Sequence, residues 1–249
     1  MPPESVKTTA ALAEAVFAQI DAACRELHIA VVGGHTEVTY GLNRPLAIGH
    51  MLGEVAKEKL ITTGGARQGD ELVLVKGIAI EATAIIAREK GQELRLRGYS
   101  PDWIARAQSY LYNPGISIVK EARLATDVAA IHAMHDPTEG GLATGLHELA
   151  QAANVGVWVD RDAITIWPEC DTLCAEFGLD PLGAIASGAL LIAVDPAHTS
   201  ALIAAYRQTD TACAVIGRVT AADKGVKLKN GTVTVDLPRF DQDEIGRLF

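Results

Sequence analysis

Short apolar runs alternate with longer segments of helical periodicity through most of this chain, and the alternation limits the folds open to it. Apolar runs of strand length occur at residues 71–75, 155–159, 189–194 and 214–219, while residues 128–134 form either a strand or a buried segment. Helical patterns occupy residues 78–89, 101–112, 114–126, 142–153 and 196–208, with a short helix around Leu173. The pattern predicts an α/β (α+β) fold in which a mixed sheet is layered with helices on one side.

The end of the chain is predicted to form a hairpin and a tail. Residues 226–229 and 232–235 alternate in polarity, and Asn230 and Gly231 between them are typical of a two-residue turn. Residues 239–249 are mostly polar, so we expect a loose tail.

The first 60 residues carry a smaller set of elements. Apolar residues recur at spacings of three and four within residues 8–28, which predicts a helix, and residues 29–32 and 45–55 are predicted strands. One helix and two strands bury too little apolar area to fold alone. We expect this part to dock on the rest of the chain, to pair with another subunit or to continue a preceding segment.

Charge and composition exclude several classes of protein. The chain of 249 residues has 31 acidic and 22 basic side chains, a net charge of -9 that argues against nucleic-acid binding. It has no basic, apolar leader pattern and no apolar run long enough to span a bilayer, which favours a cytoplasmic protein without a membrane anchor. The cysteines form neither a disulfide framework nor a zinc pattern; they are Cys24, Cys170, Cys174 and Cys213.

Loop one, defined as residues 33–37 (Gly-Gly-His-Thr-Glu), follows the predicted strand at residues 29–32. Paired glycines let a backbone turn sharply and present its amides to an anion. The threonine can donate a hydroxyl to that anion, and the glutamate can bind a cation. The same residues also fit an ordinary tight turn, and the two interpretations stay open.

Loop two, defined as residues 135–141 (His-Asp-Pro-Thr-Glu-Gly-Gly), leads from an apolar segment into a predicted helix. Its amides and the helix N-terminus form a natural anion site, and Asp136 and Glu139 are placed to bind magnesium. The alternative is a helix cap in which Asp136 or Thr138 satisfies the first helical amides.

Other catalytic patterns are absent from the sequence. His132, His135 and Asp136 resemble part of a zinc site, but no further ligand lies at a compatible spacing, so a structural or substrate-contacting histidine is expected. The chain has no Gly-x-Ser-x-Gly elbow, Walker sequence or Cys/His nucleophile pair. Covalent catalysis by the protein is therefore not expected.

Four stretches, taken together and in order, resemble the aminoimidazole ribonucleotide (AIR) synthetase superfamily of PurM-like proteins. They are most similar to its HypE-like branch, and they occupy residues 32–38, 69–76, 135–142 and 180–188. The resemblance implies a partial N-terminal AIR synthase-like α/β domain at residues 1–60, a PurM C-terminal-domain-like fold at residues 61–238 and a tail at 239–249. It also implies that ATP is used to activate a small substrate.

The resemblance and the loops together assign candidate roles. ATP and Mg²⁺ are the expected cofactors, with His35 and Asp136 as catalytic residues. Phosphate-binding residues are expected to be Gly33, Gly34, Thr36, Thr138, Gly140 and Gly141, with Lys76 as a weaker candidate. Magnesium ligands are expected to be Glu37, Asp136 and Glu139, because Mg²⁺ prefers oxygen ligands and phosphates complete its shell.

The sequence departs from the HypE-like pattern at both ends. The family's N-terminal nucleotide loop and magnesium-binding aspartates have no counterpart before Thr8, which suggests a truncated product, a fragment or a reduced relative. The family's C-terminal acceptor cysteine is also missing from residues 243–249, which speaks against thiocarboxamide chemistry.

Two alternatives to an ATP-dependent enzyme follow. One is a non-catalytic binding or assembly module of the same fold, and the other is a relative of the purine-pathway AIR synthetase. The expected partners are a small-molecule substrate and a second copy of the chain, because the family pairs its N-terminal sheets, and an unpaired strand edge at residues 29–55 would need cover.

Overall fold

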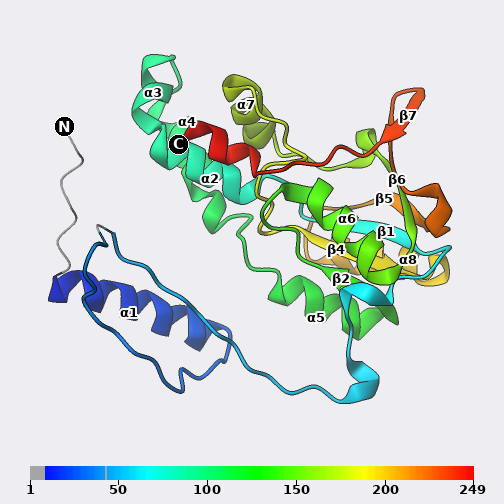
Figure 1. Ribbon diagram of the computed structural model, residues 1–249, viewed down its shortest axis with the longest axis horizontal. Helices are drawn as coiled ribbons and strands as arrows, with labels where there is room; N and C mark the ends of the chain where they lie inside the picture. Colours follow the sequence, from blue (N-terminus) through cyan, green and yellow to red (C-terminus); the bar gives the residue numbers. More distant parts are fainter. Residues whose placement is uncertain (1–8, 43) are drawn as a thin grey trace. The chain divides into compact units, whose positions relative to one another are not determined.

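The computed structural model describes residues 9–42 and 44–249 (Figure 1). It divides into two compact units, Met1–Lys57 and Glu58–Phe249. No helix in the described ranges is both long and apolar enough to cross a membrane.

The first unit contains one helix and, among its described residues, no strand. Helix α1 (Ala10–Glu26) begins after Thr9, whose Oγ1 accepts a hydrogen bond from the Leu12 amide at 3.2 Å. The strands expected at residues 29–32 and 45–55 were wrong, because neither segment enters a β-ladder. An apolar run becomes a strand only where a neighbouring strand pairs with its backbone.

The second unit is built on one seven-stranded mixed sheet in the order β2-β4-β1-β5-β3-β6-β7. Only β3 and β6 pair in parallel; the other neighbours are antiparallel. The predicted mixed α/β fold is confirmed, although the hairpin turn falls one residue later, at Gly231 and Thr232. The strands are β1 (Glu71–Val75), β2 (Ile131–His135), β3 (Gly156–Asp160), β4 (Leu190–Val194), β5 (Cys213–Thr220), β6 (Val226–Asn230) and β7 (Val233–Asp236).

Seven α-helices accompany this sheet in the described part of the second unit. Proline occupies the first turn of α4, α7 and α8, where its missing N–H costs no hydrogen bond. The helices are α2 (Ile80–Glu89), α3 (Gly91–Leu96), α4 (Pro101–Gln108), α5 (Val119–Val128), α6 (Gly141–Ala153), α7 (Pro168–Phe177) and α8 (Pro196–Gln208).

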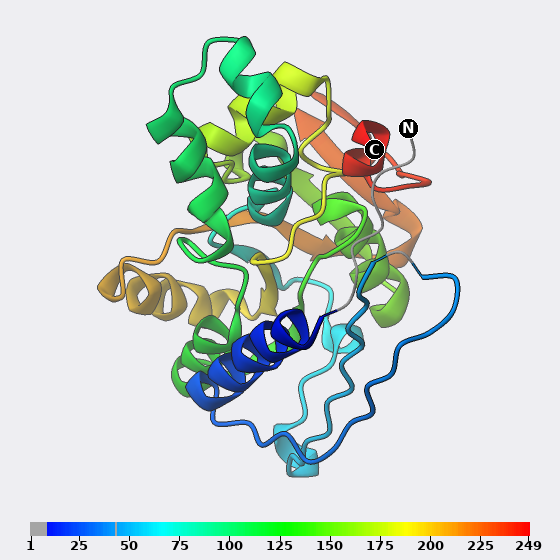
Figure 2. The ribbon, with the colours of Figure 1, turned by 90° about the vertical axis from the view of Figure 1, so that its left-hand side faces the viewer.

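Helices cover both faces of the sheet, so the expectation of helices on one side was wrong. Leu72 and Leu74 of β1 pack in one core with Leu146 of α6. The residue between them, Val73, points the other way and packs in a second core with Leu202 of α8. Figure 2 shows α5 (green) beside α8 (gold) in this second layer. Because β1 is apolar on both faces, it requires cover on both.

A third core lies among α2, α4 and α7 and includes two of the four free cysteines. Burial raises the pKa of Cys170 to about 12, so its thiol stays protonated at neutral pH. Cys174 is buried beside it with a similarly raised pKa. These two cysteines therefore pack as apolar residues.

The C-terminal tail is docked, and the expected loose tail was wrong. The Asp243 carboxylate accepts hydrogen bonds from the amides of Gly140 at 2.7 Å, Ile185 at 3.2 Å and Ile245 at 2.9 Å. The next side chain, Glu244, is buried and accepts from the Asp180 amide at 2.9 Å. Apart from Ile245, the amides that hold the tail lie far away in the sequence.

A histidine of α6 fastens the start of this tail. His147 Nε2 donates to the carbonyls of Leu237 and Pro238, each at 3.3 Å. Its Nδ1 is buried and has no hydrogen-bond partner among the described residues. Burial lowers the pKa of His147, and Arg239 lowers it further, so the fold favours the neutral ring.

We expect Asp243→Ala to lower the free energy of unfolding by about 1–2 kcal/mol, because three amides lose a charged acceptor. Urea unfolding of the full chain measures this, with Asp241→Ala as the control, since Asp241 is exposed and two residues away. Equal stability of the two variants would contradict the docked tail.

The free energy of unfolding should also decrease at acidic pH because of His147. The pKa of His147 is lower in the folded state than in the unfolded chain. Its contribution to the free energy of unfolding is therefore fully present above the unfolded pKa near 6.5, and it is lost as the pH falls toward the folded pKa. His147→Gln keeps a donor but does not titrate. The wild type should lose more stability than this variant between pH 7.5 and pH 5; an equal loss would show that His147 is not the titrating group.

Candidate functional site

The candidate site lies at one end of the sheet, where β1 and β2 end and β4 begins. Val75 pairs with Leu190, and His135 pairs with Leu191, so these strand ends are neighbours. Loop two therefore emerges beside the segment that precedes β4, and the Ala186 amide donates to the Thr138 carbonyl at 3.1 Å.

Two glycines shape loop two at the start of α6. Gly140 and Gly141 have φ values of +74° and +67°, a region that side chains rarely adopt. A Cβ on Gly141 would also lie 2.4 Å from the Leu182 carbonyl oxygen. The glycine pair is therefore required by backbone conformation and close packing, whatever the loop binds.

The helix end at loop two already holds an anion, which is the carboxylate of the chain's own tail. The Gly140 amide donates to Asp243 Oδ2 at 2.7 Å, while the Gly141 amide donates to the Thr138 carbonyl at 3.0 Å. Neither Asp136 nor Thr138 caps the first helical amides with its side chain, as the alternative for loop two would require. Sequence reasoning missed Asp243, whose one local signal is that it caps the short C-terminal helix Glu244–Leu248.

Three polar side chains of loop two face solvent. Asp136, Thr138 and Glu139 are exposed, and none of them has a hydrogen-bonded or ionic side-chain partner among the described residues. They are therefore accessible to a ligand. In the part of the chain that the structure describes, no three His, Cys, Asp or Glu side chains form a group that could bind a metal.

His135 is held at the end of β2 by partners on both ring nitrogens. Its Nδ1 lies 3.2 Å from Thr63 Oγ1, and its Nε2 lies 2.8 Å from Glu148 Oε2. Thr63 belongs to the segment that leads into β1, and Glu148 lies on α6. The ring thus ties three segments together beside loop two.

His132 forms a similar tie on the same edge strand. Its Nδ1 lies 2.8 Å from Asp70 Oδ1, and its Nε2 lies 3.1 Å from an Arg67 guanidinium nitrogen. Asp70 is buried and also accepts from the Arg67 amide at 2.8 Å. Both histidines have structural partners.

Lys76 follows β1 directly and is buried, with 4% of its surface exposed. Its Nζ donates to the carbonyls of Gly115 at 3.0 Å and Ser117 at 2.6 Å, and it lies 3.6 Å from a carboxylate oxygen of Glu121. Burial lowers the pKa of Lys76, and the nearby Glu121 opposes that shift. The side chain holds the segment before α5 against the sheet, and a contact with a nucleotide stays a prediction.

Loop one lies in the first unit, and its side chains are open. His35 Nε2 lies 3.6 Å from a carboxylate oxygen of Glu37, and these side chains are 82% and 67% exposed. Gly33 and Gly34 have open space where a Cβ would be, and Thr36 is exposed. The expected meeting of the two loops stays a prediction.

Comparison with known proteins identifies relatives of this fold. Residues 67–229 match the family model described as AIR synthase related protein, C-terminal domain. The carbamoyl dehydratase HypE of Cupriavidus necator is 31% identical over 187 residues, which cover 74% of this chain and 50% of the relative. The same protein of Rhizobium leguminosarum bv. viciae is 29% identical over 217 residues, covering 84% and 58%.

A solved structure of a protein with the same name, HypE, is also similar to this chain. The hydrogenase maturation protein HypE in complex with ATP superposes with a TM-score of 0.57 at 20% identity, covering 77% of this chain and 57% of that one. The chain thus spans about half to three fifths of the length of these relatives. The predicted resemblance is confirmed: because the family model matches more than half of its residues, this protein belongs to the AIR synthase related family.

Proposed function

We propose that this chain is a HypE-like protein that binds ATP with magnesium and activates a small substrate by phosphoryl transfer. The observation that carries the proposal is the anion-binding end of α6, where the Gly140 amide holds a carboxylate in the loop that resembles the family. A structural neighbour, HypE, forms a complex with ATP, which supports the choice of ligand.

In this proposal the phosphates are bound by amides and hydroxyls. A phosphate oxygen would replace the Asp243 carboxylate at the Gly140 amide, because one N–H cannot serve both acceptors fully. The Thr138 hydroxyl is exposed beside that amide. Gly33, Gly34, Thr36 and the Gly141 amide would complete the set, with loop one brought to loop two.

Magnesium would be bound by carboxylates and by the phosphates themselves. Asp136 and Glu139 are exposed oxygen donors without side-chain partners among the described residues, and Glu37 is an exposed donor of loop one. Three carboxylates with phosphate oxygens and water suit the octahedral shell of Mg²⁺. The ion would neutralise charge on the transferring phosphoryl group.

Catalysis would rest on positioning and charge neutralisation, with no protein nucleophile. His35 and Asp136 would contact the reacting groups. His135, tied to Thr63 and Glu148, would keep the end of β2 and thus Asp136 in place. Lys76 would act from its buried position by holding the neighbouring backbone.

We expect Asp136→Asn to weaken binding of the non-hydrolysable ATP analogue AMPPNP about tenfold in magnesium, because a charged metal ligand is lost. Affinity in EDTA should be unchanged. Isothermal titration calorimetry of the full chain measures both values.

The matched control is Asp171→Asn, which changes an exposed carboxylate on α7. Equal magnesium-dependent affinity of both variants would exclude Asp136 as a ligand. Absence of magnesium-dependent binding by the wild type would favour a non-catalytic assembly module.

We also propose that a second copy of the chain covers the first unit. None of its described residues is buried, and its large apolar side chains are unusually open: Val32 is 93% exposed, Val38 83%, Tyr40 104%, Ile48 95% and Leu52 83%. Apolar surface of this extent is typical of protein interfaces. Homodimerisation by the N-terminal parts of the family supports the choice of partner.

The chain should therefore sediment as a dimer at micromolar concentration. Val38→Asp combined with Tyr40→Asp should yield a monomer, because two charges would be buried in the interface. Sedimentation velocity distinguishes the states, with Asp223→Asn in the second unit as the control. A monomeric wild type at 100 μM, on the order of interface affinities, would contradict the proposal.

A further inference from the structure

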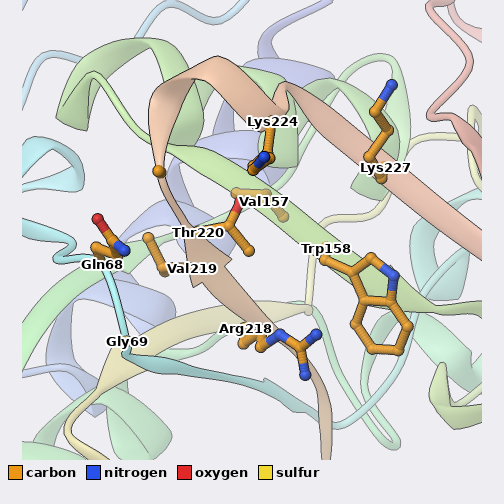
Figure 3. Close-up of a pocket in the computed structure, with 10 residues that line it drawn as sticks. Gln68, Gly69, Val157, Trp158, Arg218, Val219, Thr220, Lys224 and Lys227 are labelled. Carbon is orange, nitrogen blue, oxygen red and sulfur yellow. The ribbon is translucent and has the colours of Figure 1, made fainter.

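A pocket of about 530 Å³ opens on the second unit beside β3, β5 and β6. Figure 3 shows the side chains around it: Arg218 and Lys224 lie on opposite sides of Thr220, with Trp158 next to Arg218. Its volume lies within the range of small-molecule sites. None of the residues proposed to bind ATP or magnesium lines this pocket.

The side chains on this face form a row across three strands. Trp158 of β3 pairs with Arg218 of β5 on one side and with Lys227 of β6 on the other. Residues directly opposite in neighbouring strands project to the same face. The flanking residues Val157 and Leu228 belong to the core on the opposite face, so this row faces away from α6.

Positive charge gathers at the pocket although the whole chain carries a net charge of -9. Its lining includes Arg218, Lys224 and Lys227 and no acidic residue. Arg218 lies over the Trp158 ring at 4.8 Å and has no ion-pair partner among the described residues. Stacking on an indole fixes the guanidinium plane and leaves its N–H groups available at the edge.

The other two cations, Lys224 and Lys227, differ in how strongly they are paired with carboxylates. Lys224 lies 3.7 Å from the exposed Asp223, a weak and solvated pair. Lys227 is bonded to Asp236 and points away from Arg218 in Figure 3. Arg218 and Lys224 are therefore the groups that can bind an anion, while the charge of Lys227 is balanced by Asp236.

The pocket lies at the opposite end of β1 from loop two. Arg218 pairs with Glu71, the first residue of β1, whereas Leu191 pairs both with His135 and with Leu74, near the end of β1. Gly69, which precedes β1, also lines the pocket. Binding here is thus separable from binding at loop two.

We infer that this pocket binds a small phosphate ester whose phosphate contacts Arg218 and Lys224. An arginine fork and an ammonium match phosphate oxygens, and the volume exceeds what inorganic phosphate alone fills. Trp158, Gly69 and Ala221 also line the pocket and leave space for the organic part. A pocket of this volume that contains one unpaired cation and one weakly paired cation suits a small anion.

Calorimetric titration of the full chain with phenyl phosphate and with inorganic phosphate tests the inference. Phenyl phosphate should bind more tightly than inorganic phosphate and less tightly as salt rises. Arg218→Gln and Lys224→Gln should each weaken it about tenfold, the loss expected for one charge-assisted contact. Lys224 lies in a short exposed turn, so its variant keeps the test valid if Arg218→Gln unfolds.

Two controls separate this pocket from other sites. Lys229→Gln changes a neighbouring lysine that pairs with Asp160 and does not line the pocket, and Asp136→Asn changes loop two; both should bind phenyl phosphate like the wild type. Equal affinity in wild type and the Arg218/Lys224 double variant would overturn the inference. Arg218-dependent binding of polyglutamate without binding of phenyl phosphate would also overturn it and would assign the face to an acidic protein.

Discussion

The Asp243 carboxylate at the N-terminus of α6 is the interaction on which the proposed site depends. It joins the tail to loop two and to the segment before β4 through amides of Gly140 and Ile185. Backbone N–H groups at a helix start are unsatisfied within the helix, so an anion there removes a cost as well as adding an attraction. Loop two is therefore suited to bind an anion, and in this structure that anion is the Asp243 carboxylate of the same chain.

Most of the helices and the central strands could be predicted because their signals are local, although α3 was not predicted and α5 begins at Val119 instead of residue 114. The apolar run of β1 and the periodicity of α6 each indicate one element without reference to the rest of the chain. The segments at residues 29–32 and 45–55 carry a strand-like composition, yet pairing is decided by a partner strand that the pattern does not contain. Likewise, the covering of both sheet faces by helices could not be predicted, because it depends on which helices pack on which face.

The candidate site could be predicted only in part. The glycine pair of loop two and its exposed Asp136 stand out in the sequence, but the partner of Gly140 lies 103 residues away in an apparently ordinary polar tail. The basic pocket depends on register, because Trp158 and Arg218 become neighbours only when β3 pairs with β5. Lys76 is a weaker candidate for a nucleotide contact in the sequence, and its burial and carbonyl partners could not be predicted because they depend on the segment before α5.

In the proposed function, loop two exchanges the Asp243 carboxylate for a phosphate of magnesium-bound ATP, and loop one completes the site. A crystal structure of the full chain with AMPPNP and Mg²⁺ tests it most directly. We expect a phosphate oxygen within hydrogen-bond distance of the Gly140 amide, Asp243 displaced from that amide, and Asp136 and Glu37 beside the ion. A nucleotide bound elsewhere, with Asp243 still on Gly140, would contradict it.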